Sequence, residues 1–409
     1  MGLYCGIDWA TDHHDIAVVD DNGRVVARGR VGNDATGFAQ LLSLLATAGD
    51  TAKCPIPVGI ETDRGLWVAA LRVTGRVIYP INPLAASRYR ARYALSGAKS
   101  DATDAVLLAN IVRTDPGAHR PLPADTELAQ VIRVLARAQQ DAVWARQQIG
   151  NQIRDLLKDF YPAAIVAFAD LDGGLARPDA RAILAAAPTP AQAVKLTPAR
   201  LRRLLIKAGR KRYLDRDIER LREVFTATYL HQPPVVENAM GIQLSALLGQ
   251  FDAACAAADA LAEAATAHFE QHPDAEIITS FPGLGMLAGA RVLAEIGDDR
   301  SRFADARGLK AFAGSAPITR ASGKKTVVLH RHIKNRRLAA VGPIWALGSL
   351  RASPGARRHY DARRAAGDWN HQAQRHLFNK FLGQLHHCLH TGQGYDEHRA
   401  FPPPLSLAA

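Results

Sequence analysis

The sequence predicts an α/β domain at the N-terminal end, followed by a mainly helical remainder. Short apolar runs alternate with helix-like periodicity over residues 1–125, a pattern typical of a sheet flanked by helices. From Leu128 onward, apolar and small residues instead recur at three- and four-residue steps. A chain of 409 residues has room for roughly two or three domains. We therefore expect three parts, residues 1–125, 126–275 and 276–400.

The first part is predicted to contain strands and helices in the order β-β-β-α-β-α-β-α. The tetrapeptide Asp20-Asp21-Asn22-Gly23 is a hairpin signal between the second and third strands. The order indicates a mixed sheet with helices on its faces. The expected strands are Leu3–Asp8, Asp15–Val19, Arg24–Val31, Pro57–Ile60 and Arg76–Ile81, and the expected helices are Thr36–Leu45, Gly65–Val73 and Asp101–Val112.

The middle part is predicted to be helical and similar to a coiled coil. Apolar or small residues follow a heptad spacing from Leu128 to Ile149 and again from Leu244 to Ala265. The two helices could pair within the chain or across a dimer, and an ordinary helical bundle is the alternative. Between them, Thr197-Pro198 predicts a helix start, with threonine as the N-cap and proline at the first position. This helix and the residues after it carry a run of cations: Arg200, Arg202, Arg203, Lys207, Arg210, Lys211 and Arg212.

The last part opens with Phe281-Pro282-Gly283-Leu284-Gly285, directly before an apolar helix, Met286–Ile296. A Gly-x-Gly turn at a helix N-terminus presents backbone N–H groups and the positive end of the helix dipole to a phosphate. Helix-hairpin-helix elements bind the DNA backbone in this way, so Gly283 and Gly285 are candidate phosphate contacts. A tight turn in front of a buried helix is the alternative interpretation.

The positive charge of the chain is concentrated toward its C-terminal end. The net charge is +12, and residues 310–383 carry 15 basic and 2 acidic side chains, whereas residues 1–125 are neutral overall. This concentration favours a polyanionic partner, most often nucleic acid, over a merely solvated surface. The candidate contacts with nucleic acid in this segment are Arg320, Lys324, Lys325, Arg331, Lys334, Arg336 and Arg337.

The composition favours a cytoplasmic protein that associates with the nucleoid. No apolar run reaches the roughly 18 residues that span a bilayer, and no signal segment opens the chain. The four cysteines lie far apart and predict neither a disulfide framework nor a zinc ribbon. The histidines near the end have no acidic partner among them and are interpreted as solvated or phosphate-facing; they are His371, His376, His386, His387 and His390.

Four carboxylates are the candidates for catalysis. Asp8 ends the first expected strand, Glu61 follows a later one, and Asp101 and Asp104 lie three residues apart at the start of a helix. Adjacent strand ends can lie side by side, so these carboxylates could hold two divalent cations, Mg²⁺ or Mn²⁺, for phosphoryl transfer. Each acid also has a structural explanation, since Asp101 and Asp104 fit a first helical turn and Glu61 could pair with Arg64.

Ser322 is a second chemical candidate. It lies in Arg320-Ala321-Ser322-Gly323-Lys324-Lys325, where cations flank it and the following glycine permits a close backbone approach. A serine hydroxyl is a weak nucleophile unless a base or a metal activates it. From composition alone, a turn serine in a basic loop is the simpler interpretation. Ser315, in Gly314-Ser315-Ala316-Pro317, is the neighbouring alternative.

The order and spacing of these motifs resemble the DEDD-type insertion-sequence transposases, the family that includes Piv-like DNA invertases and bridge-RNA-guided recombinases. The resemblance extends over nearly the whole chain. The motifs that carry it are Gly6-Ile7-Asp8, the strand ending at Glu61, Lys99–Ala105, Pro282–Gly285, Leu293–Asp298, Phe312–Gly314, Ala316-Pro317 and Ser322-Gly323. The chain departs from the family at His332–Arg337, where a glycine that is common in this stretch is missing.

The resemblance implies a RuvC-like, RNase H-type N-terminal domain whose acidic tetrad corresponds to Asp8, Glu61, Asp101 and Asp104. It also implies that the tetrad binds Mg²⁺ and that Ser322 attacks the DNA backbone to form a phosphoserine intermediate. The implied partners are DNA at the element ends and the target, a non-coding bridge RNA, and further copies of the chain in a dimer or tetramer.

The sequence therefore predicts a DNA transposase or site-specific recombinase. A junction-resolving nuclease that uses water as its nucleophile is the nearest alternative, with Ser322 as a structural residue. A sugar-kinase or actin-like ATPase also opens with a motif like Gly6-Ile7-Asp8 and a hairpin, but the sequence shows no second phosphate-binding turn. A nucleic-acid-binding protein without catalysis is the remaining alternative.

Overall fold

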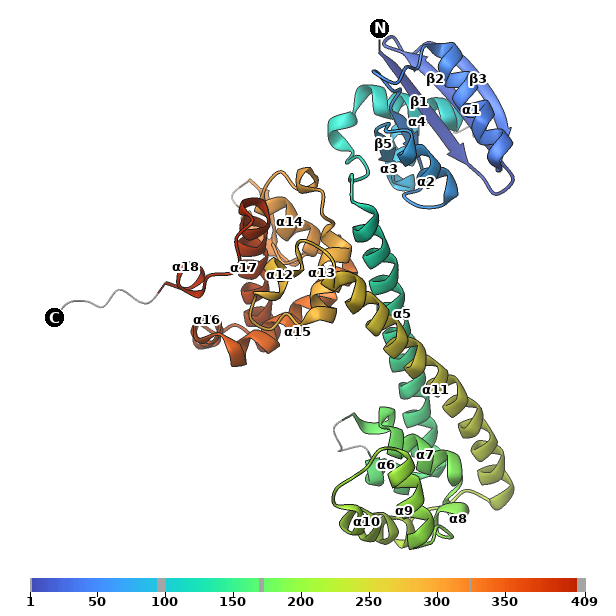
Figure 1. Ribbon diagram of the computed structural model, residues 1–409, viewed down its shortest axis with the longest axis vertical. Coiled ribbons are helices and arrows are strands. Elements are labelled where there is room, and N and C mark those ends of the chain that lie inside the picture. Colours follow the sequence, from blue (N-terminus) through green and yellow to red (C-terminus); the bar gives the residue numbers. More distant parts are fainter. Residues whose placement is uncertain (1, 94–100, 169–172, 324, 403–409) are drawn as a thin grey trace, which may run out of the picture. The chain divides into compact units, whose positions relative to one another are not determined.

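The structure is a computed structural model that describes residues 2–93, 101–168, 173–323 and 325–402. The chain divides into two compact units, residues 1–124 and 125–409 (Figure 1). Each unit has its own hydrophobic core. Within the described ranges, no helix is both long enough and apolar enough to cross a membrane.

The N-terminal unit contains a five-stranded mixed sheet with the strand order β3-β2-β1-β4-β5. β1 pairs antiparallel with β2 and parallel with β4; β2 and β3 are antiparallel, and β4 and β5 are parallel. The predicted mixed sheet is confirmed, with one added helix. The strands are β1 (Leu3–Trp9), β2 (His13–Asp20), β3 (Val25–Gly32), β4 (Val58–Ile60) and β5 (Ile78–Pro80), and the helices are α1 (Ala35–Ala48), α2 (Leu66–Val73), α3 (Pro83–Tyr93), α4 (Asp101–Thr114) and the short η1 (Pro116–Ala118).

α3 is the helix that the sequence analysis did not predict. Its start is marked by Asn82, whose side-chain oxygen accepts a hydrogen bond from the backbone N–H of Leu84 at 2.8 Å. Its buried face is small, because Ala86 packs with Leu108 and Ile111 of α4 while most of the helix surface is polar. A helix with so narrow an apolar stripe gives little periodicity for a sequence pattern to detect.

Two glycines allow α4 to lie directly on the sheet. A Cβ atom at Gly6 of β1 would lie 2.0 Å from the carbonyl oxygen of Ala105, and a Cβ atom at Gly59 of β4 would lie 2.7 Å from Cγ2 of Val112. Protein interiors are close-packed and cannot accommodate atoms at such distances. Glycine at both positions therefore sets how closely α4 approaches β1 and β4.

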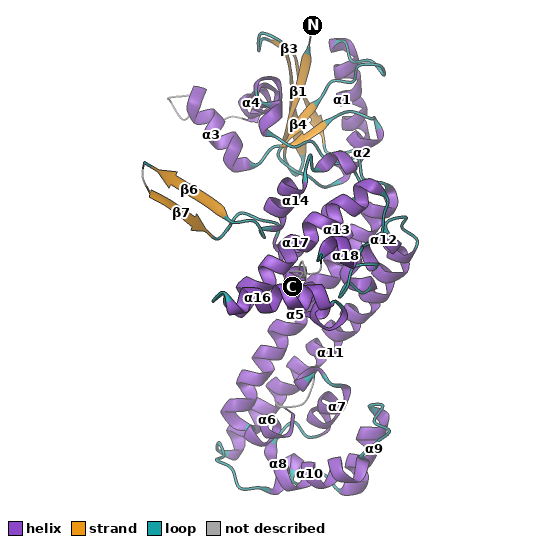
Figure 2. Ribbon diagram, turned by 90° about the vertical axis from the view of Figure 1, so that its left-hand side faces the viewer, coloured by secondary structure: helices purple, strands orange, loops and turns teal. Residues whose placement is uncertain are grey.

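The second unit is helical in its described residues apart from one two-stranded hairpin. Two long helices, α5 (Glu127–Phe160) and α11 (Pro234–Glu270), pack against each other within the chain (Figures 1 and 2). The other elements are α6 (Pro162–Phe168), η2 (Gly174–Ala176), α7 (Pro178–Ala186), α8 (Pro190–Ala193), α9 (Pro198–Lys207), α10 (Leu214–Thr226), α12 (Ala275–Thr279), α13 (Met286–Ile296), η3 (Arg300–Arg302), α14 (Ala306–Ala313), β6 (Ile318–Ser322), β7 (Lys325–Leu329), α15 (Arg336–Ala352), α16 (Pro354–Ala365), α17 (Asn370–Thr391) and α18 (Glu397–Ala400).

Four of the seven predicted heptad positions of α11 are buried and three are partly buried, whereas none of those of α5 is buried. Leu244 and Phe251 of α11 are at most 3% exposed, as the heptad spacing predicts. On α5, however, Val131 of the predicted face is 39% exposed, whereas its neighbours Ile132 and Ala136 are buried. The reason is a second contact, because this half of α5 also packs against α13 in the C-terminal core.

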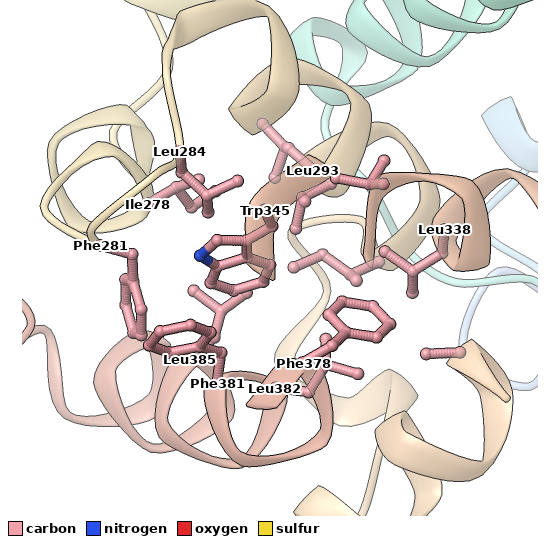
Figure 3. Packing of buried hydrophobic residues seen from close by; sticks show 14 of the residues in the cluster. Ile278, Phe281, Leu284, Leu293, Leu338, Trp345, Phe378, Phe381, Leu382 and Leu385 are labelled. Carbon is pink, nitrogen blue, oxygen red and sulfur yellow. The ribbon is translucent and has the colours of Figure 1, made fainter. Parts of the chain in front are cut away.

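The C-terminal core is built around Trp345 of α15. Its fully buried indole stacks on Phe381 of α17 with 5.2 Å between ring centroids and meets Phe281 edge-on (Figure 3). The indole N–H donates a hydrogen bond to the carbonyl oxygen of Pro282 at 3.1 Å. Aromatic stacking and this hydrogen bond together fix the turn before α13 against α15.

β6 and β7 form an antiparallel hairpin that no sequence pattern predicted. The register pairs Ile318 with Leu329 and Ser322 with Lys325. Every residue of the two strands except Ile318 is exposed. An isolated two-stranded hairpin is only marginally stable in water. Because nearly all its residues are exposed, the surface of this hairpin is available for contact with a partner.

Gly6→Ala is expected to destabilise the N-terminal unit. The added methyl group would lie 2.0 Å from the Ala105 carbonyl oxygen, and overpacking of this kind lowers the free energy of unfolding by about 1–3 kcal/mol. Hydrogen exchange of the β1 amides in the full chain measures the loss. Gly117→Ala is the matched control, because a Cβ atom there would meet no atom within 4 Å. Equal protection in the two variants would contradict the close approach of α4.

Candidate active site

Asp8 and Glu61 lie at the same end of two neighbouring parallel strands. Ile7 of β1 pairs with Ile60 of β4, so Asp8 and Glu61 occupy the next position along each chain. Neighbouring strands lie about 4.8 Å apart. Both residues are partly buried. The register therefore brings two of the four predicted acids to one edge of the sheet.

The Asp8 side chain is directed to the face that α4 covers, and Glu61 follows a glycine that lies on the same face. Gly6 faces α4, and residues two apart on a strand point to the same face of a sheet, so Asp8 faces α4 as well. Glu61 follows Gly59 by the same step, and Gly59 also faces α4. Glu61 forms no ion pair with any described residue, and the predicted pairing with Arg64 is not observed among them.

The first turn of α4 lies toward this same edge of the sheet. Arg113, in the last turn of α4, donates a hydrogen bond to the carbonyl oxygen of Asp21 at 3.1 Å. Asp21 follows the end of β2, which pairs with the start of β1. α4 therefore runs opposite to β1, and Asp101 and Asp104 lie on the side where β1 ends. The side chain of Asp101 is outside the described part of the structure.

Asp104 is held by an arginine that the sequence analysis did not identify. The carboxylate is 5% exposed, and the Arg90 guanidinium donates two hydrogen bonds to its Oδ1 atom, at 2.5 and 3.1 Å. The ion pair offsets the cost of burying the carboxylate. Arg90 lies on α3, 14 residues before its partner, and no local motif links residues at that separation on two different helices.

Asp15 is a further carboxylate that the sequence analysis did not single out. It lies directly opposite Asp8 in the β1–β2 register, so the two side chains share a face. Arg30 of β3 donates to both oxygens of Asp15, at 3.0 and 2.8 Å. The negative charge of Asp15 is thus already matched within the sheet, and we assign it a structural role beside Asp8.

The donor chemistry fits a divalent cation at Asp8 and Glu61. Carboxylate oxygens are the ligands that Mg²⁺ prefers in proteins, and these two acids lie at one sheet edge. Among the side chains that the structure describes, no group of three or more His, Cys, Asp or Glu residues is arranged to hold an ion. Arg90 occupies Oδ1 of Asp104, so Asp104 could join such a site through its Oδ2 atom while it keeps the ion pair.

Ser322 lies at the tip of the exposed β6–β7 hairpin. It is the last residue of β6, and its side chain is exposed. Gly323 follows with a φ of +56°, in the left-handed region that favours glycine. Among the described residues, the Ser322 hydroxyl has no hydrogen-bond partner. The serine is therefore accessible to a large substrate, and no described residue of the hairpin is hydrogen-bonded to it as an activating base.

Ser315, the alternative nucleophile, has a structural role. It is 4% exposed, and its hydroxyl donates a hydrogen bond to Oδ1 of Asn379 at 2.8 Å. This bond ties the segment after α14 to α17. A buried hydroxyl with this partner is inaccessible to a nucleic-acid backbone, so the geometry favours Ser322 over Ser315.

Arg320, Lys325 and Arg336 are exposed and form no ion pair with any described residue. Arg320 and Lys325 lie on the hairpin beside Ser322, and Arg336 is the first residue of α15. Lys324 is outside the described residues. These exposed cations have the freedom to meet a phosphate group.

The other predicted phosphate contacts take part in packing within the unit. Arg337 donates to both oxygens of Asp141 on α5, at 2.8 and 2.9 Å. Arg331 donates to a backbone carbonyl at 3.3 Å. The side chain of Lys334 covers Gly314, where a Cβ atom would lie 2.2 Å from its Cδ atom. Each of these residues thus stabilises the base of the hairpin rather than its tip.

Asn335 anchors the stretch in which the glycine is missing. Its side-chain oxygen accepts from the Leu338 N–H at 2.8 Å and caps α15, while its Nδ2 atom donates to Glu295 of α13 at 2.6 Å. Glu295 is 2% exposed and also accepts two hydrogen bonds from Arg137 of α5, at 2.7 and 2.8 Å. The network fixes the base of the hairpin to two other helices.

The two glycines of the turn before α13 are in different surroundings. Gly283 has a φ of +83°, and a Cβ atom there would lie 2.3 Å from the backbone nitrogen of Ser349 on α15. Close helix packing therefore explains Gly283. Gly285 is exposed, and a Cβ atom there would meet no atom within 4 Å. A phosphate contact at this turn is thus sterically open at Gly285.

Two histidines, His330 near the hairpin and His386 on α17, have lowered pKa values. Burial lowers the pKa of His330 below its usual value, and Lys334 and Arg375 lower it further. Burial also lowers the pKa of His386, whose ring stacks on His390 with 4.1 Å between centroids. These two rings therefore add little to the positive charge that the arginines and lysines of this region carry.

Family models match both ends of the chain. A model described as a transposase matches residues 5–162, which include Asp8, Glu61, Asp101 and Asp104. A second model, described as the transposase IS116/IS110/IS902 family, matches residues 275–361, which include Ser322.

Full-length relatives agree with these matches. The chain is 61% identical to the mini-circle putative transposase for IS117 of Streptomyces coelicolor, over 100% of this chain and 99% of that protein. It is 27% identical to the insertion element IS900 uncharacterized 42 kDa protein of Mycobacterium paratuberculosis, over 100% and 99% of the two chains. It is 30% identical to the insertion element IS110 uncharacterized 43.6 kDa protein of Streptomyces coelicolor, over 87% and 83%.

These findings confirm the resemblance that the motifs indicated. The identity to the IS117 relative extends over the whole length of both chains. The chain therefore belongs to the IS116/IS110/IS902 family of DNA transposases.

Proposed function

We propose that this transposase cuts and rejoins DNA at the ends of an insertion element, with Ser322 as its nucleophile. The observation that carries the proposal is the exposure of Ser322 at a hairpin tip, between Arg320 and Lys325, neither of which forms an ion pair with a described residue. Cations in such positions stabilise the charge that develops on a phosphate under attack. The buried hydrogen bond of Ser315 leaves Ser322 as the accessible serine of this segment.

The proposal divides the reaction among three parts of the chain. Residues 1–125 form a RuvC-like, RNase H-type domain that carries the acidic tetrad. Residues 126–275 form a coiled-coil-like linker that also serves oligomerisation, and residues 276–400 form a basic transposase domain with the serine. The mixed sheet of the first unit and the helical second unit support the first of these boundaries, whereas the boundary at residue 275 lies within the second unit.

The acidic tetrad would hold Mg²⁺ or Mn²⁺ through Asp8 and Glu61, with Asp101 and Asp104 as further ligands. A bound divalent cation would supply charge stabilisation to the phosphate oxygens. Within the chain, the β1–β4 register orients Asp8 and Glu61 at one edge, and Arg90 keeps the buried Asp104 carboxylate in place.

In the proposed chemical step, Ser322 Oγ forms a bond to the phosphorus atom of a DNA phosphodiester. The bond from phosphorus to the 3′ oxygen breaks, and that oxygen takes a proton and leaves as a 3′ hydroxyl. The serine loses its proton to a base or to water. After strand exchange, a 3′ hydroxyl attacks the phosphoserine and releases Ser322, which restores the number of phosphodiester bonds.

The proposal includes a bridge RNA, as the resemblance implies. Base pairing by the RNA would select the DNA, so that the protein needs contacts only with phosphates. The exposed Arg320, Lys325 and Arg336, and the open position at Gly285, suit phosphates of either nucleic acid. Assembly into a dimer or tetramer completes the proposal.

A nuclease that uses water as its nucleophile is the second candidate function. One observation favours it, because the Ser322 hydroxyl has no hydrogen-bond partner among the described residues and hence no base beside it. In that case the acids would act on a water molecule, and no covalent protein–DNA adduct would form.

Asp8→Asn and Glu61→Gln are expected to reduce excision of the element by about 100-fold or more, because each variant removes charge that stabilises the transition state. Electrophoresis of end-labelled element DNA with Mg²⁺ measures excision, and a gel shift measures binding, which should survive. Asp63→Asn, which changes an exposed acid two residues from Glu61, is the control. Normal excision by the Glu61→Gln variant would contradict the role of the tetrad.

Ser322→Ala is expected to eliminate both recombination and the covalent adduct, because the nucleophilic oxygen is absent. Denaturing electrophoresis traps the adduct, and mass spectrometry locates the phosphoserine. Thr319→Ala removes an exposed hydroxyl from the same strand and should leave both intact. Strand cleavage by Ser322→Ala without any adduct would support the water-dependent nuclease, and full recombination would exclude the serine from the reaction.

A further inference from the structure

A second cationic surface lies on the helices that follow α5. Arg200, Arg203 and Lys207 of α9 recur at three- and four-residue spacing and share one face of the helix. All three are exposed, whereas Leu201 and Leu205 are buried on another face. We call Arg200, Arg203 and Lys207 the α9 row. It spans about 10 Å along the helix axis.

The α9 row has no counter-charge in the described structure. Two neighbouring arginines, in contrast, have acidic partners in the first turn of α10. Arg202 pairs with Asp215, and Arg210 pairs with Asp217. The acids at the start of α10 are thus used by arginines outside the row. Among the described residues, no side chain forms an ion pair with a member of the row. An unmatched row of cations is complementary to a chain of phosphates.

Tyr213, between α9 and α10, has an unfavourable backbone conformation. Its φ of 59° and ψ of 27° lie in the left-handed region. Among the described residues, Tyr213 is the only one other than glycine that has a positive φ. A side chain is disfavoured there. Tyr213 is also the N-cap of α10 and provides no side-chain cap, whereas serine, threonine, aspartate or asparagine would. Glycine or asparagine would therefore suit this position better for folding.

The side chain of Tyr213 forms no hydrogen bond or ring contact with a described residue that would offset this strain. It is 70% exposed, and most of its ring surface faces solvent. Lys211 and Arg212, directly before it, are also exposed and form no ion pair there. Strain that packing does not explain is a pointer to function.

We propose that the α9 row, Lys211, Arg212 and Tyr213 bind an unpaired segment of nucleic acid. The cations would contact successive phosphates, and the exposed tyrosine ring would stack on a base. An unpaired strand fits better than a duplex, because the faces of bases inside a duplex already stack on each other. This ligand is a single strand or a loop of RNA or DNA.

The surface is separate from the Ser322 hairpin. α13 contacts α5 near Arg137, whereas α6–α10 follow α5 after Phe160 and share a different core with its second half (Figure 2). The part of α5 between Arg137 and Phe160 is about 35 Å long. The surface would therefore hold a strand without taking part in its cleavage, and this inference does not depend on the proposed serine chemistry.

The test uses the full chain without divalent cations and measures the anisotropy of short fluorescent oligonucleotides. Tyr213→Gly removes the ring and also relieves the backbone strain. Thermal stability should stay the same or rise, while affinity for a single strand should fall about 5- to 150-fold, the range for loss of one stacked base. Tyr213→Trp keeps a stacking ring and should retain the affinity.

A second variant tests the α9 row. Replacing all three of its cations by glutamine should lower the slope of log affinity against log salt by about 2, since each phosphate contact of a single strand contributes about 0.7. The matched control replaces three other exposed cations of this helical cluster by glutamine: Lys158, Lys195 and Arg222. It removes the same net charge and should leave the slope near its original value.

Photo-cross-linking separates this surface from the basic C-terminal domain. A single strand with photoreactive pyrimidines should cross-link to the peptide that contains Tyr213, and mass spectrometry identifies that peptide. Comparing RNA, DNA and a duplex of the same sequence shows which source provides the ligand. Unchanged binding by both Tyr213→Gly and the triple variant, or a preference for the duplex, would overturn the proposal. Ser322→Ala should bind the strand normally, so failure of the serine mechanism is distinguishable.

Discussion

The buried carboxylate of Glu295 is the interaction on which the second unit depends. It lies on α13, accepts two hydrogen bonds from Arg137 of α5 and one from Asn335 at the start of α15. Removing one partner of a buried ion pair costs about 3–5 kcal/mol, because the remaining charge is left without compensation. Three helices are thus oriented around one charge, and the segment that follows the Ser322 hairpin is anchored at the same asparagine cap. The position of the candidate nucleophile follows from a contact made at the base of its hairpin.

In the N-terminal unit, close steric packing of a helix on the sheet, rather than a buried charge, positions the candidate acids. Gly6 and Gly59 let the backbone of α4 lie directly on β1 and β4, and the parallel register then brings Asp8 and Glu61 to one edge. The acids are placed by the backbone and do not need contact with one another. Arg30 and Arg90 balance the nearby carboxylates of Asp15 and Asp104. Mutual repulsion among the acids is thereby limited before any metal is considered.

Sequence patterns predicted the elements that have a strong period and missed those that do not. The five strands of residues 1–125 and the helices α1, α2 and α4 were predictable because their apolar faces repeat regularly. α3 and the β6–β7 hairpin were not, because α3 buries little more than Ala86 and the hairpin strands bury almost nothing. Likewise, the heptad spacing predicted the wrong buried face for α5. Ile132 and Ala136 are buried because they contact α13, and the sequence of α5 alone does not indicate that contact.

The candidate site shows the same division between local and long-range information. Motif order indicated Asp8, Glu61 and Ser322, because each of them lies in a short sequence motif. The ion pairs of Arg90 with Asp104 and of Arg137 with Glu295 join residues on separate helices, so no local spacing marks them. A glycine needed for helix packing and a glycine needed for a phosphate are identical in a sequence. Only the proximity of Ser349 distinguishes the role of Gly283 from that of Gly285.

The net charge of +12 comes from separate groups of cations that act independently of one another. At physiological ionic strength the Debye length is about 8 Å, whereas the α9 row lies beyond about 35 Å of helix from the C-terminal core. Charges on the α9 row therefore cannot add to the potential around Ser322. Arg337 is also withdrawn from that potential by its ion pair with Asp141. The hairpin must attract its phosphate with its own few exposed cations, and the distant row can act only on a strand that reaches it.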